Sequence, residues 1–389
     1  MDEKSKRFLG NASKASIFRT LIRRGPMSRV ELSKQLPLSK MSVTNYINEL
    51  IADGLVHETG TMTSESGRKP VLLDVSGSCP LFVSVQITRF YISVGIINCK
   101  GRFQNINMSP IEQADTNSSV FSKIVMLLDQ VLTPEVLERT WAIGASSMGP
   151  VSCDDGAIFT TERPDVQSCI QIREPLEQRY GIPVYVNNDV NTLVFAEKYF
   201  GSAGDYETFA VVGSSVGLGC GLMVRGQLYC GENGLGAALG HVTVEVEGRP
   251  CYCGNRGCLE QYASIPAVTE WVRAEFEKRG APCTYNNWQD FLSGVEQGDE
   301  ICRLGFERLV KYLGAGLVTL VNLFNPGCIF LGECYAQAAP LLAAPLEQYI
   351  RDHQFFPRQV VTEVKGSHFM GTSPLIGPAA FAMHRSLNP

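Results

Sequence analysis

The sequence predicts an α/β protein in which a small helical N-terminal domain precedes a two-lobed body. Three observations support this prediction. The first 74 residues contain helical segments with the spacing of a helix–turn–helix, strands and helices alternate from about Leu81, and a second run of strands opens at Thr208. At 389 residues, the chain is long enough for two or three domains with separate cores.

Composition narrows the functional classes. Apolar residues make up 44% of the chain and charged residues 19%, as in an ordinary globular protein. No apolar run reaches the roughly 18 to 20 residues of a membrane span, and the N-terminus lacks the apolar stretch of a secretion signal. The 13 cysteines, an odd number scattered through predicted core segments, fit reduced thiols better than a disulfide framework. The sequence therefore predicts a cytoplasmic protein without membrane insertion.

Charge separates the N-terminal head from the rest of the chain. Residues 1–74 hold 12 Lys and Arg against 8 Asp and Glu, whereas the whole chain has a net charge of −5. A mildly basic head on an acidic body indicates that only the head contacts a polyanion.

Within this head, the pattern predicts a winged helix–turn–helix. Ser28, with Glu31 at the capping-box position, starts a short helix, and Ser39 starts a longer one. The predicted elements are helices over 11–23, 29–35 and 40 to about 52, followed by wing strands over 55–59 and 71–74.

Polar and basic side chains of the short helix, the longer helix and the wing are the candidates for DNA contacts. Ser, Thr, Asn, Lys and Arg donate to phosphates or base edges. The candidates are Arg29, Lys40, Ser42, Thr44, Asn45, Arg68 and Lys69. The last two follow Gly67 in the wing and suit a minor groove or its phosphates. The head thus predicts binding to a double-stranded DNA operator, and the alternative is a helical domain used for dimerisation.

A group of metal-ligating residues lies in the second half of the chain. His241 is followed after nine residues by Cys251-Tyr-Cys253, and after four more by Cys258. One imidazole and three thiolates are the ligand set of a structural Zn²⁺ site, because a catalytic site leaves one coordination position open. Two glycines inside the segment allow the tight turns that such convergence needs. We therefore expect a zinc knuckle over residues 241–260.

The same segment resembles the signature of the ROK family, which includes transcriptional repressors and sugar kinases. The similarity covers residues 234–241 and the motif from Cys251 to Glu260, and it continues more weakly from about residue 80 to the C-terminus. This resemblance implies an actin-like (ribonuclease H-like) body with a structural zinc and with substrates held between two lobes. The head resembles the DNA-binding heads of the repressor branch.

The predicted domains follow from this resemblance together with the strand and helix pattern. They are a winged helix–turn–helix over 1–74, a first actin-like lobe over 78–194 completed by a C-terminal helix at about 374–389, and a second lobe over 195–373. In the second lobe, we predict a helix over 314–324. We also predict a loop over 286–290, in which Trp288 packs against a helix.

The chain departs from the kinases of the family at their first phosphate loop. That loop has the form Asp-x-Gly-Gly-Thr-Lys, and the aligned segment here is Gln86-Ile-Thr-Arg-Phe-Tyr91. An amide replaces the carboxylate, and side chains stand where the backbone must approach phosphate. A second loop, Gly213–Gly221, is better preserved, but Glu333 lies in the adenosine region. Because phosphoryl transfer depends on positioning and charge, we expect no enzyme activity.

The resemblance implies a sugar site formed by Asn188, Asp189, His241 and Glu260. Asn188 holds sugar hydroxyls, and Asp189, the base of a kinase, only accepts a hydrogen bond in a regulator. His241 binds zinc through one ring nitrogen and sugar through the other. Ala238 replaces the usual glutamate, which weakens or alters sugar binding. The alternative for Asn188 and Asp189 is a strand-end turn in which Asp189 caps the following helix.

Together these features predict a transcriptional repressor of carbohydrate metabolism genes. A sugar or sugar phosphate bound between the lobes changes their closure and lowers the operator affinity of a homodimer or homotetramer. Two alternatives stay open: an ATP-dependent sugar kinase with residual activity, and a regulator controlled by a protein partner such as a sugar transporter component.

Overall fold

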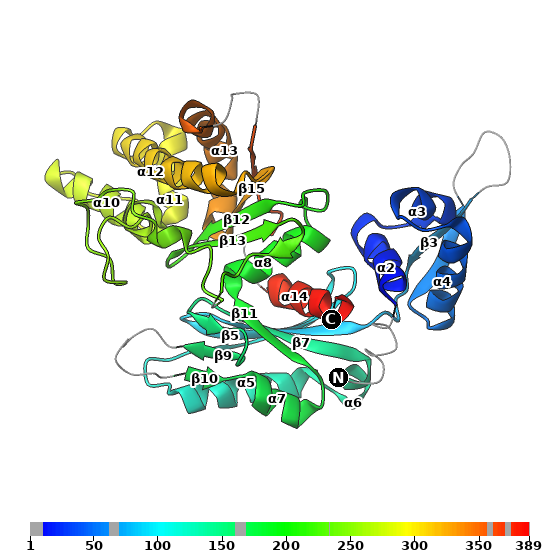
Figure 1. Cartoon of the computed structure of the whole chain (residues 1–389). Helices are drawn as coiled ribbons and strands as arrows, with labels where there is room; N and C mark the ends of the chain where they lie inside the picture. The colour runs from blue at the N-terminus through cyan, green and yellow to red at the C-terminus, as the bar shows by residue number, and fades with distance from the viewer. Residues whose placement is uncertain are drawn as a thin grey trace. The chain divides into compact units, whose positions relative to one another are not determined.

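The chain divides into two compact units, Met1–Phe200 with Pro374–Pro389, and Gly201–Ser373 (Figure 1). The computed structural model describes residues 11–61, 70–159, 169–232, 234–355, 361–369 and 375–388. Each unit has a hydrophobic core of its own, and the predicted α/β organisation is confirmed. None of the helices in these ranges has the length and apolar character needed to cross a membrane.

The N-terminal part of the first unit combines helices with a small antiparallel sheet (blue in Figure 1). Its elements are α2 (Ala12–Arg24), β1 (Met27–Ser28), α3 (Arg29–Gln35), α4 (Lys40–Ala52), β2 (Val56–Thr61) and β3 (Val71–Val75), with strand order β1-β3-β2. Asn11, Ser28 and Ser39 cap the helices by accepting backbone N–H groups, and Ser28 forms the predicted capping box. The capping residues thus set where each helix begins.

The rest of the first unit is a sheet covered by helices on both faces (Figure 1). Its strand order is β11-β7-β4-β5-β6, parallel from β11 to β4 and antiparallel from β4 to β6. The elements are β4 (Leu81–Ile87), β5 (Tyr91–Asn98), β6 (Phe103–Pro110), α5 (Asn117–Val131), α6 (Pro134–Arg139), β7 (Thr140–Ser147), α7 (Arg173–Tyr180), β11 (Val184–Asn188), α8 (Asp189–Tyr199) and α14 (Ile376–Leu387). A small second sheet contains β8 (Val151–Ser152), β9 (Ala157–Phe159) and β10 (Cys169–Gln171).

Helix α14 packs closely on this sheet although it comes from the other end of the chain. A Cβ at Gly144 in β7 would overlap the carbonyl oxygen of Pro378 in α14, so only glycine permits this approach. Helices α8 and α14 lie side by side on one face, and α5 and α7 cover the other (Figure 1). The parallel strands therefore end at the edge where α8 begins, which places Asn188 and Asp189 there.

The second unit is built on a mixed sheet in the order β14-β13-β12-β15-β16. Its elements are β12 (Phe209–Ser214), β13 (Leu218–Val224), β14 (Gln227–Leu228), η1 (Leu239–His241), α9 (Glu260–Ala263), α10 (Ile265–Lys278), α11 (Trp288–Gln297), α12 (Glu300–Phe324), β15 (Cys328–Gly332), α13 (Glu333–His353) and β16 (Glu363–Gly366). The metal-ligating segment lies between η1 and α9.

Two predictions for the second unit need correction. Helix α12 begins at Glu300, well before residue 314, because Asp299 caps it by accepting a hydrogen bond from Cys302 N at 2.9 Å. Its three glycines do not end the helix but allow close packing, since a Cβ at each would press on side chains of neighbouring segments. Trp288 begins α11 instead of lying in a loop. Its ring is buried and its Nε1 donates to Cys334 O at 3.0 Å, so the predicted packing role is confirmed.

Candidate metal centre and its surroundings

The metal-ligating segment folds back on itself as a compact knuckle. A short antiparallel bridge pairs Thr243 with Cys258. Gly257, at φ 72°, lies so close to Glu245 that a Cβ would overlap the Glu245 carbonyl oxygen. Only glycine fits this position, and the resulting turn brings Cys258 back beside His241.

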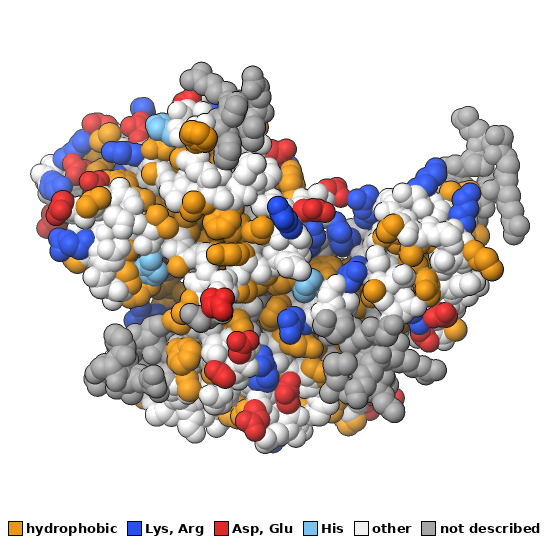
Figure 2. Space-filling model, in the orientation of Figure 1, with side chains coloured by type: hydrophobic (Ala, Val, Ile, Leu, Met, Phe, Trp, Pro, Cys, Tyr) orange, Lys and Arg blue, Asp and Glu red, His pale blue; other side chains and the backbone are white. Residues whose placement is uncertain are grey.

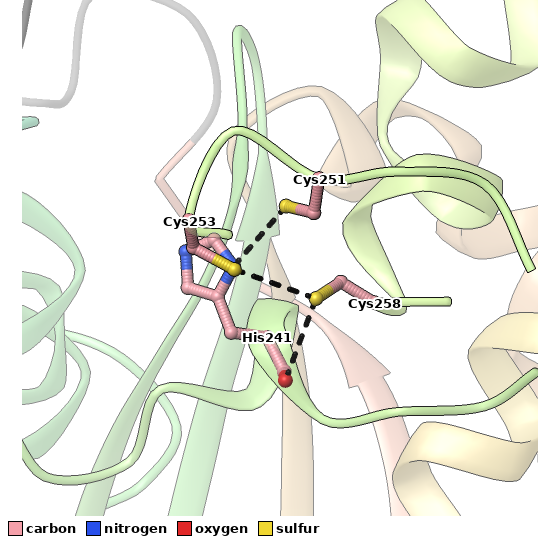
Figure 3. A group of neighbouring side chains, drawn as sticks. All are labelled: His241, Cys251, Cys253 and Cys258. Atoms are coloured by element: carbon pink, nitrogen blue, oxygen red, sulfur yellow. Dashed lines mark hydrogen bonds between the residues drawn. The ribbon is translucent and has the colours of Figure 1, made fainter. Parts of the chain in front are cut away.

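The four predicted ligands converge on one point (Figure 3). Their ligand atoms all lie within 4.8 Å of one another. Cys251 Sγ is 3.7 Å from His241 Nδ1, and Cys253 Sγ is 3.7 Å from Cys258 Sγ. Two thiolates bound to a tetrahedral zinc at about 2.3 Å are separated by about 3.8 Å. The side chains therefore fit a four-coordinate metal ion, with Nδ1 as the imidazole ligand.

The electrostatics of the cluster also fit a cation. Burial, together with the neighbouring Cys253 and Cys251 thiols, raises the pKa of Cys258 to about 12, because adjacent thiolates repel one another. Asn255 Nδ2 donates to Cys258 Sγ at 3.5 Å, and Gln261 Nε2 donates to Cys251 Sγ at 3.6 Å. Such N–H···S hydrogen bonds support thiolate ligands, and a shared metal ion would remove the repulsion.

The knuckle contacts the glycine-rich loop of the same unit. Glu260, the first residue of α9, accepts a hydrogen bond from Leu218 N at 2.9 Å and is 7% exposed. On the other side, a Cβ at Gly240 would overlap the carbonyl oxygen of Leu218. Glu260 thus binds the backbone N–H of Leu218, Gly240 packs against its carbonyl, and the carboxylate predicted to contact a sugar is used within the protein.

The ring of His241 faces two ways. Its Nδ1 points to the thiols, while its Nε2 lies 3.3 Å from the Tyr252 hydroxyl. The prediction gave one ring nitrogen to zinc and the other to a sugar, and Nδ1 is the nitrogen that faces the thiols. Tyr252 is 73% exposed, and a sugar hydroxyl at Nε2 would have to replace its hydroxyl. The sugar contact itself stays a prediction.

The glycine-rich loop over residues 213–219 has its Ser214 hydroxyl bonded within the protein and carboxylates at its border. Ser214 Oγ donates to Gly217 O at 2.7 Å and accepts the first backbone N–H of α10 at 3.0 Å. Glu333, at φ 52°, fills the space beside Gly213, where a Cβ would lie 3.0 Å from Glu333 Oε2. With Glu260 already on Leu218, two carboxylates border the loop and oppose an anionic ligand.

The turn that aligns with the first phosphate loop of the kinases is closed on itself. Thr88 Oγ1 accepts hydrogen bonds from Phe90 N at 3.2 Å and from Tyr91 N at 3.0 Å, and it donates to Tyr91 O at 3.0 Å. Gln86 is buried in β4, and Phe90 is 61% exposed. The N–H groups of this turn are therefore occupied by its own hydroxyl.

In the first unit, Asn188 and Asp189 lie where β11 ends and α8 begins. Asn188 is the N-cap of α8: its side chain accepts from Val190 N at 3.1 Å and donates to Ser147 O at 3.4 Å. The capping alternative named Asp189, but the residue that caps α8 is Asn188, and Asp189 is the first residue of the helix. Asp189 is 9% exposed, and burial raises its pKa to about 6. Among the described residues, only backbone N–H groups donate to this carboxylate, which leaves it able to accept a further hydrogen bond.

The head presents most of its predicted DNA contacts at the surface. Lys40, Thr44 and Asn45 are exposed on α4, Ser42 is half-buried, and the buried residues of the helix are Val43, Ile47 and Leu50. Arg29 forms an ion pair with a wing glutamate at 3.2 Å. Figure 2 shows Lys and Arg side chains (blue) spread over the visible face of the head. Arg68 and Lys69 lie outside the described residues.

Sequence reasoning missed three features of these sites. The Thr88 hydroxyl closes its turn, Glu260 binds Leu218, and Met41 is 75% exposed at the start of α4. The threonine itself is a signal of the closed turn, because a Thr hydroxyl often accepts a hydrogen bond from the backbone N–H two residues later. The second has no local signal. Met41 stands one helical turn before the predicted contact Asn45, which is the signal for the third.

Comparison with known proteins finds a family model and named relatives that match this chain. The model described as ROK family matches residues 82–385. The xylose repressor of Caldicellulosiruptor bescii is 24% identical over 390 residues, covering 98% of this chain and 97% of its own. The N-acetylglucosamine repressor of Escherichia coli is 26% identical over 343 residues, covering 86% of this chain and 84% of its own.

Among the similar solved structures, one matches nearly the whole chain and another matches the body without the head. A ROK family transcriptional regulator, described as a homologue of the Escherichia coli MLC protein, matches with a TM-score of 0.79 and 26% identity over 98% of this chain and 97% of its own. A ROK family glucokinase from Streptomyces griseus, solved with glucose and AMPPNP, matches with a TM-score of 0.66 and 23% identity. The glucokinase is covered to 99% but accounts for only 78% of this chain, as a body without the head would.

Proposed function

Because this chain belongs to the ROK family, we propose that it is a DNA-binding transcriptional repressor of carbohydrate metabolism genes. The observation that carries the proposal is the match over nearly the full length to proteins named xylose repressor and to the structure of a transcriptional regulator. The glucokinase fold accounts for 78% of the chain. A helical head beyond a kinase-like body is what a sugar-responsive repressor needs and a kinase does not.

The head supports operator binding as a winged helix–turn–helix. Helices α3 and α4 are the two helices of the motif, α4 enters the major groove, and β2 and β3 form the wing. The proposed contacts are Arg29, Lys40, Ser42, Thr44 and Asn45, with Arg68 and Lys69 in the segment that joins β2 to β3. One head offers few phosphate contacts, so the repressor acts as a homodimer or homotetramer on a near-palindromic operator.

The knuckle holds one structural Zn²⁺ through His241, Cys251, Cys253 and Cys258. Its support is the convergence of the four ligand atoms at distances that suit tetrahedral coordination. All four positions are filled by the protein, so a bound ion contributes stability and no chemistry. It fixes the knuckle against the glycine-rich loop through Glu260.

The effector is a sugar or sugar phosphate that forms hydrogen bonds with Asn188 and Asp189 of the first unit. The support is the buried carboxylate of Asp189, whose raised pKa is typical of a functional group kept out of water. Effector binding lowers operator affinity by favouring one arrangement of the body over another. Without catalysis, Asp189 serves as a hydrogen-bond acceptor.

Two experiments test the repressor proposal. The full-length, zinc-loaded protein is offered a pool of random DNA duplexes, and we expect enrichment of a near-palindromic sequence with a Kd on the order of 10⁻⁸ M at physiological salt. A panel of sugars, amino sugars and their phosphates is then screened for thermal stabilisation and for release of the selected duplex, with Asp189→Ala as the control. Failure to enrich any duplex contradicts the proposal.

A residual sugar kinase activity is the first alternative, because the body resembles a sugar kinase in fold. We propose that the chain has none, because Thr88 occupies the N–H groups of one loop and Glu260 and Glu333 border the other. ADP release across a hexose panel tests this point, and turnover abolished by Asp189→Asn overturns it. Ala238 favours a second alternative, control by a transporter component, which a pull-down without a stoichiometric partner excludes.

A further inference from the structure

The solvent face of α4 carries one apolar side chain among polar ones. Met41, Asn45 and Asn48 follow one another at helical spacing and are all exposed; we refer to these three residues as the α4 stripe. Met41 is 75% exposed, whereas the apolar residues Val43 and Ile47 of the same helix are fully buried. A single exposed methionine is ordinary on a protein surface, so its meaning depends on its neighbours along the stripe.

Most hydrogen-bonding groups near the stripe are already used. Ser42 Oγ lies 2.9 Å from Ser39 Oγ at the helix N-terminus, and Thr44 Oγ1 donates to Lys40 O at 2.9 Å. Arg29 pairs with Glu58 and also reaches Asn48 Oδ1 at 3.5 Å. Across the described residues, Asn45 makes no such contact, and its amide is available to a ligand.

An available asparagine amide one turn from an exposed methionine matches one kind of base pair. In the major groove, adenine offers N7 and N6 to a bidentate asparagine, and thymine offers a 5-methyl group to an apolar side chain. Side chains four residues apart on a helix are about 6 Å apart, which spans one to two base-pair steps. The stripe therefore has the chemistry and the spacing to read neighbouring A·T pairs.

We propose that Met41 and Asn45 read A·T base pairs of the operator: Met41 packs on a thymine methyl group, and Asn45 bonds the edge of an adenine one or two steps away. This inference rests on the proposed DNA-binding function and sharpens it. It leaves the other proposed contacts of α4, Lys40, Ser42 and Thr44, to the phosphates and not to base edges.

The test uses the full-length protein and the duplex that it enriches from a random pool. Each thymine of the duplex is replaced singly by deoxyuridine, which removes only the methyl group, and each adenine by 7-deazaadenine, which removes N7. Affinities are measured by fluorescence anisotropy for the wild type, Met41→Ala, Met41→Gln and Asn45→Ala. Asn48→Ala, at an exposed residue of the same stripe that is no proposed base contact, is the matched control. The replaced side chains of Met41 and Asn45 are exposed, so these variants are expected to unfold at the wild-type temperature.

We expect deoxyuridine at one position per half-site to weaken wild-type binding about fourfold, as the loss of one buried methyl group does. Met41→Ala and Met41→Gln remove the contact from both half-sites, so they lose about 16-fold on the natural duplex and become insensitive to that replacement. Asn45→Ala weakens binding roughly 5- to 150-fold per half-site and becomes insensitive to 7-deazaadenine at one position. The control keeps both sensitivities.

Two failures are distinguishable. If the variants retain the wild-type sensitivity to deoxyuridine and 7-deazaadenine at every position, or if the enriched half-site lacks an A·T pair with these sensitivities, the assignment of Met41 and Asn45 is wrong while DNA binding stands. If no duplex is enriched, the DNA-binding function fails and the stripe assignment fails with it.

Discussion

Helix α4 and the glycine-rich loop over residues 213–219 both carry hydrogen-bonding groups, but they differ in whether these groups are already bonded within the protein. On α4, Lys40 and Asn45 are exposed and, within the described ranges, make no side-chain hydrogen bond or ion pair. In the loop, Leu218 N is bound by Glu260, and Ser214 Oγ is bound to Gly217 O. The side chains of Lys40 and Asn45 are therefore available to a partner, whereas these groups of the loop already form hydrogen bonds within the protein.

The difference lies in how readily each surface accepts a ligand. A free donor gains a full hydrogen bond from a ligand, whereas a committed donor must first lose one that contributes about 0.5–1.5 kcal/mol. A phosphate at the loop also meets the carboxylates of Glu260 and Glu333. Anionic partners are therefore favoured at the head and opposed at the loop, which is the pattern of a repressor built on a kinase fold.

The largest expected effect comes from the zinc ligands, because the knuckle holds the loop closed. Cys258→Ser removes one ligand of the cluster and is expected to abolish zinc binding and to destabilise the protein by about 4 kcal/mol or more. Metal content by mass spectrometry and urea unfolding measure both effects. Cys283→Ser, a half-buried cysteine of the same unit outside the cluster, is the control and keeps its zinc. Equal stability of Cys258→Ser and the wild type contradicts a structural metal.

A pair of glycines tests whether the shape of the knuckle matters apart from its ligands. Gly257 and Gly254 both have positive φ, but a Cβ overlaps backbone only at Gly257 and meets nothing within 4 Å at Gly254. Gly254→Ala is expected to cost about 1 kcal/mol, the usual penalty of the left-handed region. Gly257→Ala adds a steric overlap and is expected to cost about 3 kcal/mol or more and to weaken zinc retention. Similar losses in the two variants show that packing on Glu245 is unimportant.

The sequence predicts those features that depend on neighbours in the chain. The capping box of Ser28 and the spacing of the cysteines are local, and the structure has the capping box and brings the cysteines together. The contact between Leu218 and Glu260 joins residues 42 positions apart. No local pattern tells whether that carboxylate faces a sugar or a backbone N–H, so the sequence assigned it only by resemblance.

Exposure is the second property that the sequence leaves open. The helical pattern of α4 predicts that Val43 and Ile47 face inward, and both are buried. It does not separate polar groups that are free from those that are bonded within the helix, because Ser42 and Thr44 suit either role. The proposed DNA and sugar contacts therefore stay predictions. The structure shows which of their side chains are exposed and which already form hydrogen bonds within the protein.

A smaller effect, of opposite sign, is expected at the sugar side. Burial raises the folded-state pKa of Asp189 to about 6 from 3.8, so the native state binds the extra proton between these values. Wild-type stability therefore falls as the pH rises from about 4 to 6 and stays reduced above it. Asp189→Asn cannot ionise and is expected to be more stable than the wild type by up to about 3 kcal/mol above pH 6, with no gain below pH 4.

Urea unfolding of both proteins between pH 4 and pH 8 measures the difference, in which pH effects common to both cancel. Asp154→Asn, at an exposed carboxyl of the same unit, is the control for removing one negative charge. A destabilised Asp189→Asn at pH 8 means that the carboxylate has a partner that stabilises its charge. In that case, Asp189 is not the available acceptor that an effector needs.

The smallest effect concerns the closed turn of the first unit. Thr88→Val keeps the shape of the side chain but removes the hydroxyl that accepts from Phe90 N and Tyr91 N, and Thr88→Ser keeps that hydroxyl. Since the freed N–H groups are near solvent, Thr88→Val is expected to lose only about 1 kcal/mol, and Thr88→Ser less. Neither variant is expected to bind magnesium AMPPNP in calorimetry, because freeing two N–H groups restores neither the missing glycines nor the carboxylate replaced by Gln86. If Thr88→Val binds the nucleotide and Thr88→Ser does not, the Thr88 hydroxyl is the main obstacle to nucleotide binding. The turn of the first unit then resembles α4, whose groups are available to a ligand, more than the loop over residues 213–219.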